Sequence, residues 1–409
     1  MSNPDKKKSF SDFFAEGQFQ TQTETLERKG NKGSISIGIP KEHTLSETRV
    51  ALVPNNIRTL IGYGHEIKVE TGAGIKSNFT DHDYSEAGAK IASGQKEIFE
   101  CDVVVKVTPP DLAEIALMKP NQILITPLHI PTITKEKIEK IKEKRIIAIA
   151  MEYFQSNDGT FPIVRIMSEI AGMSAMLTAA ELLCYSEKGR GILLGGVSGV
   201  PPAKVIILGA GVVGEFATRT ALGLGASVRV FDSDISKLMR FQSNIGRQLH
   251  TSSFNPVYLG YQLMSADVVI GAIHSKTGSS PVLVTEDMVA KMKQGSVIID
   301  VSIDQGGCIE TSRMTTHDNS TYVKHDVIHY CVPNIASKVP RTASVAISNI
   351  LTSLLVQTGD AASVESLLFD NTGIRNGVYV YKGCCTNLYL SKKFGIKHTS
   401  LDLLLTSSF

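Results

Sequence analysis

Net charge is nearly absent from this sequence. Lys and Arg number 42 and Asp and Glu number 40, so the 409 residues carry a formal charge of only +2. This balance provides no broad electrostatic field that would attract nucleic acid or an acidic membrane surface. Neither is therefore predicted as a partner.

Long apolar runs are also missing. No stretch reaches the roughly 18 uninterrupted apolar residues that a membrane-spanning helix needs. Residues 1–34 are polar, and the three lysines at 6–8 have no apolar segment behind them, so we expect no secretory signal. The six cysteines show neither a C-x-x-C pair nor metal-finger spacing. The pattern predicts reduced thiols, a cytoplasmic location and no metal site.

What is present is a glycine motif in residues 204–232. Residues 205–208 form an apolar run of strand length, as in a parallel strand buried on both faces. Gly209, Gly211 and Gly214 follow and satisfy G-x-G-x-x-G, after which the sequence has helical periodicity. The first glycine permits a tight turn, the second leaves room for a pyrophosphate, and the third lets the helix pack close to the strand. The motif predicts dinucleotide binding.

The second strand of this unit, residues 227–231, ends in Asp232, 18 residues beyond Gly214. A carboxylate there can bind the ribose 2′-hydroxyl and repel a 2′-phosphate, which favours NAD over NADP. Val212 and Val213 lie inside the glycine motif and are expected to border the cofactor.

Strands alternate with helical segments along most of the chain, which indicates an α/β fold with two doubly wound parallel-sheet domains. We predict a Rossmann NAD domain over residues 167–340, inserted in a discontinuous substrate domain over residues 34–166 and 341–409. Residues 1–33 are predicted to be a flexible N-terminal arm. A helix beginning near residue 341 is expected to cross back to the first domain.

Ligands gather at the carboxyl ends of strands in such sheets. Arg49, Lys106 and His129 are expected at that edge of the first domain, and Asp304 at that edge of the second. Arg49 and Lys106 suit an anionic substrate, and His129 can transfer protons near neutral pH. Asp304 can stabilise a cationic nitrogen or order a water. Each of these four residues could instead have a purely structural role. Glu152 could be a structural carboxylate or a group that supports a catalytic residue.

Several motifs in order resemble the family of alanine dehydrogenases and the alpha subunit of proton-pumping nicotinamide nucleotide transhydrogenase. These motifs are Gly-Ile-Pro-Lys-Glu at 38–42, Arg-Val-Ala at 49–51, Leu-His at 128–129, Met-Ser-Glu at 167–169, Gly-Arg-Gly at 189–191, Gly-Gly-Val at 195–197 and Ile-Asp-Gln-Gly-Gly at 303–307. The resemblance covers residue 34 to beyond residue 350.

The resemblance implies reversible oxidative deamination of L-alanine by NAD to pyruvate and ammonium, in a homo-oligomer that is commonly a hexamer. It implies that Arg49 binds the carboxylate, His129 is the acid/base and Asp304 is a catalytic carboxylate. Further residues are implied to hold NAD together with the glycines: Ser168, Asp232, Ile273 and Asn334.

One departure concerns the substrate site. The family usually reads Lys-Val-Lys-Glu-Pro where this chain has residues 106–110, so Thr108 stands at the second lysine, which binds substrate in the family. Lys106, two residues earlier, is expected to supply part of that role. Three alternatives remain: an NAD-binding protein like the transhydrogenase alpha subunit, a noncatalytic NAD sensor, or a dehydrogenase of another small 2-amino acid.

Overall fold

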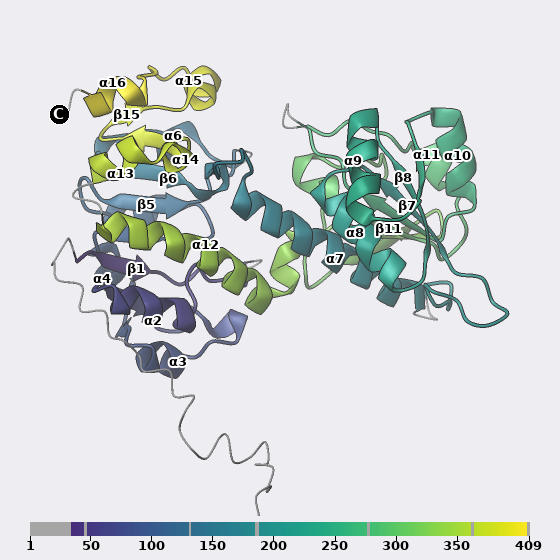
Figure 1. The fold of residues 1–409 in the computed structure, drawn as a ribbon, viewed down its shortest axis with the longest axis horizontal. Coiled ribbons are helices and arrows are strands. Elements are labelled where there is room, and N and C mark those ends of the chain that lie inside the picture. Colours follow the sequence, from purple (N-terminus) through teal and green to yellow (C-terminus); the bar gives the residue numbers. More distant parts are fainter. Residues whose placement is uncertain are drawn as a thin grey trace, which may run out of the picture. The chain divides into compact units, whose positions relative to one another are not determined.

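The computed structural model describes residues 34–406 except 45–46, 131, 185–187, 276–278 and 361–363. The arm predicted over residues 1–33 lies outside the described residues. Two β-sheets with helices between their strands organise the described part of the chain (Figure 1). This architecture confirms the predicted α/β class with two doubly wound sheets, while the domain boundaries themselves stay a prediction.

The first sheet has eight strands in the order β15-β14-β6-β5-β4-β1-β2-β3. Its strands are β1 (Ser36–Ile39), β2 (Glu66–Glu70), β3 (Lys90–Ala92), β4 (Val103–Val105), β5 (Ile123–Thr126), β6 (Ile147–Ala150), β14 (Val378–Tyr381) and β15 (Cys384–Cys385). Strands β1 to β6 pair in parallel, so their carboxyl ends meet at one edge. That edge is where the sequence analysis places Arg49, Lys106 and His129.

Each face of this sheet packs on its own helices. On β4, Val103 and Val105 belong to the buried cluster that includes α2 and α12, whereas Val104 belongs to the cluster with α5 and α6. Burying one such side chain contributes about 1.5–3 kcal/mol, which explains why these strands are apolar on both faces. The segments around the sheet are α2 (Pro54–Gly62), η1 (Ile75–Ser77), α3 (Asp81–Glu86), α4 (Gln95–Phe99), α5 (Leu112–Leu117), α6 (Lys135–Glu143), η2 (Met151–Tyr153), α13 (Val364–Asp370), α14 (Thr372–Arg375), α15 (Leu388–Phe394) and α16 (Leu401–Thr406).

The second sheet has seven strands in the order β12-β13-β11-β10-β7-β8-β9. The strands are β7 (Lys204–Leu208), β8 (Ser227–Phe231), β9 (His250–Ser252), β10 (Val268–Gly271), β11 (Val297–Asp300), β12 (Thr321–Lys324) and β13 (Val327–Tyr330). The segments beside them are α8 (Val212–Gly223), α9 (Ile235–Ile245), α10 (Pro256–Met264), α11 (Glu286–Val289), η3 (Val301–Gln305) and η4 (Ile335–Lys338). On β7, Val205 and Ile207 pack with α7, α8 and α9, and Ile206 and Leu208 with α10 and α11.

The strand–helix–strand unit predicted around the glycine motif is confirmed as β7, α8 and β8. Gly209 has φ +115°, and a Cβ there would lie 2.3 Å from the carbonyl oxygen of Ala272. A Cβ at Gly214 would lie 2.0 Å from the carbonyl oxygen of Gly209. Any larger residue at either position would force the tight turn apart.

Two long helices contribute to both halves. Helix α7 (Pro162–Cys184) packs along α8, and α12 (Pro340–Asp360) packs on α2 and α7. The predicted crossing helix near residue 341 is thus confirmed, and α7 begins at Pro162, whose fixed φ suits the first turn of a helix. By length and composition alone α7 could span a membrane, but half of its most apolar window is buried inside the protein.

Both sheets depart from the parallel prediction at an edge. Strand β14 pairs antiparallel with β6 and β15, and β12 pairs antiparallel with β13. Lys382 and Gly383, between β14 and β15, both have positive φ, and so do His325 and Asp326, between β12 and β13. Two-residue turns of this kind match the twist of antiparallel hairpins. The C-terminal segment therefore extends the first sheet as well as covering it.

Candidate active site

A cavity of about 650 Å³ is walled by residues that follow the strands of both sheets. Most of the residues predicted from the sequence line it, namely Arg49, His129, Ser168, Gly211, Val212, Val213, Ile273, Asp304 and Asn334. Four of the predicted residues do not line it: Lys106, Gly209, Gly214 and Asp232. One cavity thus joins the candidate catalytic groups to the dinucleotide loop.

The glycine loop fits a pyrophosphate. Gly211 begins α8 without a side-chain cap, so the first N–H groups of the helix are not taken by a capping side chain. A Cβ placed on Gly211 would meet no atom within 4 Å, which leaves open space above the bare backbone. Free N–H groups and a positive helix end attract phosphate oxygens. Val212 and Val213 border the same space.

Asp232 stands behind this loop. Its Oδ2 accepts the N–H of Ala210 at 2.8 Å, and its Oδ1 accepts the N–H of Asp234 at 2.9 Å. The carboxylate is buried and ties the end of β8 to the glycine loop. Each oxygen keeps a second acceptor direction. Lys237, in the first turns of α9, supplies a cation to the cavity lining that the sequence analysis did not single out.

A chain of polar contacts connects Arg49 to Asp304. The Arg49 guanidinium donates through Nε to Glu47 Oε1 and through an Nη to Glu47 Oε2, both at 2.7 Å. Asn334 donates its side-chain amide to Glu47 Oε2 at 3.2 Å and its backbone N–H to Asp304 Oδ1 at 3.0 Å. Glu47 therefore fixes the guanidinium plane and joins it to the second sheet's loops. The sequence analysis missed Glu47, although it lies two residues before Arg49.

His129 and Asp304 form the titratable pair of the cavity. Burial lowers the pKa of His129, and the nearby charge of Asp304 partly offsets this. Burial raises the pKa of Asp304, against the opposing effects of the Asn334 N–H and of the His129 and Arg49 charges. In both groups burial thus favours the uncharged form.

Lys106 lies elsewhere. Its side chain is 2% exposed, and its Nζ is 2.5 Å from Glu114 Oε1 and 3.3 Å from Glu42 Oε2. Burial opposes the charged form, but Glu42 and Glu114 raise the pKa of Lys106 overall. Thr108 donates its hydroxyl to the same Glu42. Lys106 thus forms a buried ion-pair network beside the cavity and presents no ammonium to it, unlike the substrate role expected from the sequence.

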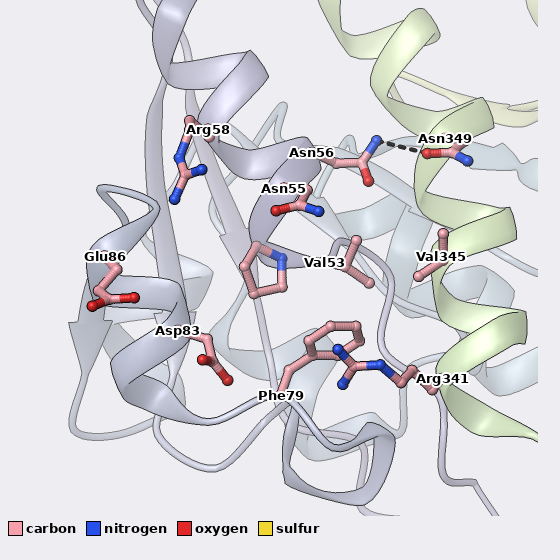
Figure 2. Close-up of a pocket in the computed structure, with 11 residues that line it drawn as sticks. Val53, Asn55, Asn56, Arg58, Phe79, Asp83, Glu86, Arg341, Val345 and Asn349 are labelled. Atoms are coloured by element: carbon pink, nitrogen blue, oxygen red, sulfur yellow. Dashed lines mark hydrogen bonds between the residues drawn. The ribbon is translucent and has the colours of Figure 1, made fainter. Parts of the chain in front are cut away.

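A second cavity of about 310 Å³ lies where α2, α3 and α12 meet (Figure 2). The guanidinium of Arg341 lies over the ring of Phe79 at 4.2 Å, and Asn56 donates to Asn349 at 3.0 Å across the two helices. No residue predicted from the sequence lines this cavity. Its contacts explain how α12 is attached to α2.

Known proteins and family models match nearly the whole chain. A family model described as alanine dehydrogenase/PNT, N-terminal domain, matches residues 38–171, and the model of the C-terminal domain matches residues 175–388. Alanine dehydrogenase 2 of Staphylococcus aureus (strain USA300) is 39% identical over 370 residues, covering 90% of this chain and 99% of that protein.

Solved structures of similar proteins also cover most of the chain. An L-alanine dehydrogenase structure superposes with a TM-score of 0.83 at 36% identity, covering 88% of this chain and 99% of that one. A transhydrogenase from Sinorhizobium meliloti superposes with a TM-score of 0.74 at 24% identity, covering 87% and 99% of the two chains. The second likeness concerns the fold alone.

Proposed function

The chain belongs to the alanine dehydrogenase/PNT family, and from that premise we propose that it catalyses the reversible, NAD-dependent oxidative deamination of L-alanine. The reaction converts L-alanine, NAD⁺ and water to pyruvate, ammonium, NADH and a proton. The observation that carries the proposal is a single cavity lined both by His129, Asp304 and Arg49 and by the glycine loop.

Arg49 binds the carboxylate of the substrate. Its guanidinium is held by Glu47 and also points one Nη at Met167 Sδ, 3.4 Å away, so its orientation is fixed before substrate arrives. Among the described residues that line the cavity, the other Lys or Arg is Lys237, which belongs to the second sheet's helices. Arg49 is therefore the main anchor for the anionic group.

His129 and Asp304 manage the protons. With its pKa lowered by burial, His129 is neutral near pH 7 and can accept a proton from the water that attacks Cα. Asp304 lies beside the developing cationic nitrogen and stabilises it. The glycine loop, together with Ser168, Ile273 and Asn334, would hold NAD, and bound NAD would accept the hydride that leaves Cα.

The sequestered Lys106 favours a second candidate, a noncatalytic NAD sensor. In that case the chain would bind cofactor in the same loop but lack the second substrate-binding cation that the family's motif supplies. A transhydrogenase-like role would likewise predict cofactor binding without alanine turnover.

NADH oxidation by the purified protein with pyruvate, measured with and without ammonium, separates these functions. Ammonium-dependent oxidation is the expected result. Oxidation without ammonium would indicate a 2-hydroxy acid dehydrogenase. Bound NADH with no oxidation would replace the proposal by the sensor or transhydrogenase-like function. Other 2-oxo acids, tested in place of pyruvate, define the side-chain preference.

Asp232→Ala tests the cofactor assignment. Removing a charged hydrogen-bond acceptor costs about 1.5–3 kcal/mol, so NAD⁺ should bind roughly 10- to 100-fold more weakly. NADP⁺ should lose less, because the repulsion of a 2′-phosphate is removed as well. Both affinities can be measured by fluorescence titration, with Asp287→Ala, an exposed carboxylate on α11, as the control. An unchanged ratio of the two affinities would remove Asp232 from cofactor selection.

We propose in addition that the protein is a cytoplasmic homo-oligomer, with a hexamer as the size that the resemblance implies. All six cysteines are free thiols, which suits a reducing compartment. Met173 and Leu177, one turn apart on α7, are 38% and 55% exposed, so the half of this apolar helix that is not buried presents side chains a second copy can cover.

Leu177→Asp should therefore lower the molar mass measured by light scattering after gel filtration, because a charge would be buried in the subunit contact. Leu403→Asp, on α16 at 69% exposure, is the matched control and should leave the mass unchanged. Equal masses for wild type and Leu177→Asp would exclude α7 from the contact.

A further inference from the structure

The backbone of His129 has an unusual conformation. Its φ is +46°, in the left-handed region that residues other than glycine rarely adopt. Such a conformation costs on the order of 1–3 kcal/mol and persists only where surrounding contacts impose it. Several contacts come from the following loop: the N–H groups of Thr132 and Ile133 donate to the His129 carbonyl at 3.0 Å and 3.2 Å, and the Thr132 hydroxyl lies 2.7 Å from Nδ1.

A further contact comes from the turn that follows the neighbouring strand. Strands β5 and β6 pair in parallel up to Thr126 and Ala150, so the segments that follow them lie side by side. Glu152, in the turn after β6, reaches across to the segment after β5. Its Oε1 accepts the N–H of Leu128 at 2.7 Å and the N–H of His129 at 3.2 Å. Both N–H groups of the left-handed bend thus converge on one carboxylate oxygen.

The second oxygen of Glu152 is buried and, among the described residues, has no hydrogen-bond partner. Burial raises the pKa of this carboxyl, although the backbone N–H of Glu152 itself and those of His129 and Leu128 oppose the shift. Leaving a carboxylate oxygen buried and unpaired costs stability. Groups that carry such a cost beside a cavity are frequent at functional sites, and Glu152 lines the same cavity as His129.

We propose that Glu152 is the positioning residue of the reaction: its Oε1 clamps the backbone at Leu128 and His129 and so sets where the imidazole stands relative to Asp304. The inference rests on the proposed function, in which His129 transfers the proton. Glu152 acts through His129 and needs no contact with substrate. It gives the ambiguous carboxylate of the sequence analysis a defined role.

Three substitutions of Glu152 distinguish the effect of its hydrogen bonds to the Leu128 and His129 N–H groups from the effect of its negative charge. Glu152→Gln keeps a neutral oxygen that can accept both N–H groups, so kcat should stay within about threefold of wild type. Glu152→Ala removes the acceptor, and kcat should fall about a hundredfold, the loss that a misplacement of about 1 Å produces. Glu152→Asp keeps the charge but shortens the arm and should also lose most of kcat. KM for pyruvate and the Kd for NADH should change little in all three.

A double-mutant cycle tests whether the effect passes through His129. In a His129→Asn background, adding Glu152→Ala should cause no further loss of kcat, because the group being positioned is already gone. A further loss of tenfold or more would overturn the proposal, and so would a wild-type kcat in Glu152→Ala. Equal losses in Glu152→Gln and Glu152→Ala would show that the charge, not the clamp, matters.

A measurement that does not depend on turnover distinguishes failure of this inference from failure of the proposed function. Diethyl pyrocarbonate labelling of His129, followed by mass spectrometry, should be faster in Glu152→Ala and Glu152→Asp than in wild type and Glu152→Gln. His82, exposed on α3, serves as the internal reference. Unchanged labelling of His129 in Glu152→Ala overturns the clamp even in a protein without dehydrogenase activity, and should Glu152→Ala not fold, Glu152→Asp carries the test.

Discussion

Replacing His129 with Asn is expected to lower kcat for ammonium-dependent NADH oxidation about 10³-fold, within the range that loss of a general acid–base group produces. Asn can keep the contact with Thr132 that Nδ1 makes, so the loop should retain its shape. The affinity for NADH should stay within about twofold, because the imidazole is assigned to substrate chemistry and not to the glycine loop.

The pH dependence follows from the same residue. In the deamination direction His129 must be neutral to accept a proton, and burial lowers its pKa below the ordinary 6.5. The acid limb of the kcat/KM profile should therefore lie below pH 6.5, and it should disappear in His129→Asn. His82→Asn, a substitution of an exposed histidine on α3, should reproduce the wild-type profile. Wild-type turnover in His129→Asn would remove this residue from the mechanism.

The second large effect concerns stability. Replacing Lys106 with Met should lower the free energy of unfolding by about 3–5 kcal/mol, because Glu42 and Glu114, each 5% exposed, would be left buried without their cation. Urea denaturation measures the change. Lys140→Met breaks an exposed pair with Glu143 on α6, and it should cost at most about 1 kcal/mol.

A rescue variant makes this prediction specific. Adding Glu42→Gln and Glu114→Gln to Lys106→Met removes the unpaired charges but keeps acceptors for the N–H groups of Val107 and Asp111. Most of the lost stability should return. If Lys106→Met instead raised KM for pyruvate without changing the free energy of unfolding, Lys106 would be a substrate ligand after all, as the sequence analysis expected.

The glycine loop and Lys106 show what can and what cannot be predicted from the sequence. The glycine loop could be predicted because strand, turn, helix and acid are contiguous in residues 204–232 and each obeys a local rule. No such local rule predicts the direction in which a single long side chain points. Lys106 follows directly after β4, but whether its ammonium points into the cavity depends on Glu42, in the segment after β1, and on Glu114, in α5.

The same limit applies to the contacts that complete the site. Glu47 was missed although it is two residues from Arg49, since only the folded chain brings Asn334 and Asp304 to its other side. The clamp of Glu152 needs the pairing of β5 with β6 to be known. The antiparallel edges depend on the turns at 325–326 and 382–383, where only one of the four residues is glycine, so the usual hairpin signal is weak.

The pairing of β14 with β6 has a consequence for how this chain is made. The seven-stranded sheet is complete once residue 330 has left the ribosome, whereas the eight-stranded sheet waits for residues 378–385. Ser344 and Ser348 of α12 accept the N–H groups of Val50 and Val53, on the segment that carries Arg49. During synthesis the seven-stranded sheet can thus fold first, and the eight-stranded sheet, with the segment that carries Arg49, is completed only when nearly the whole chain has emerged.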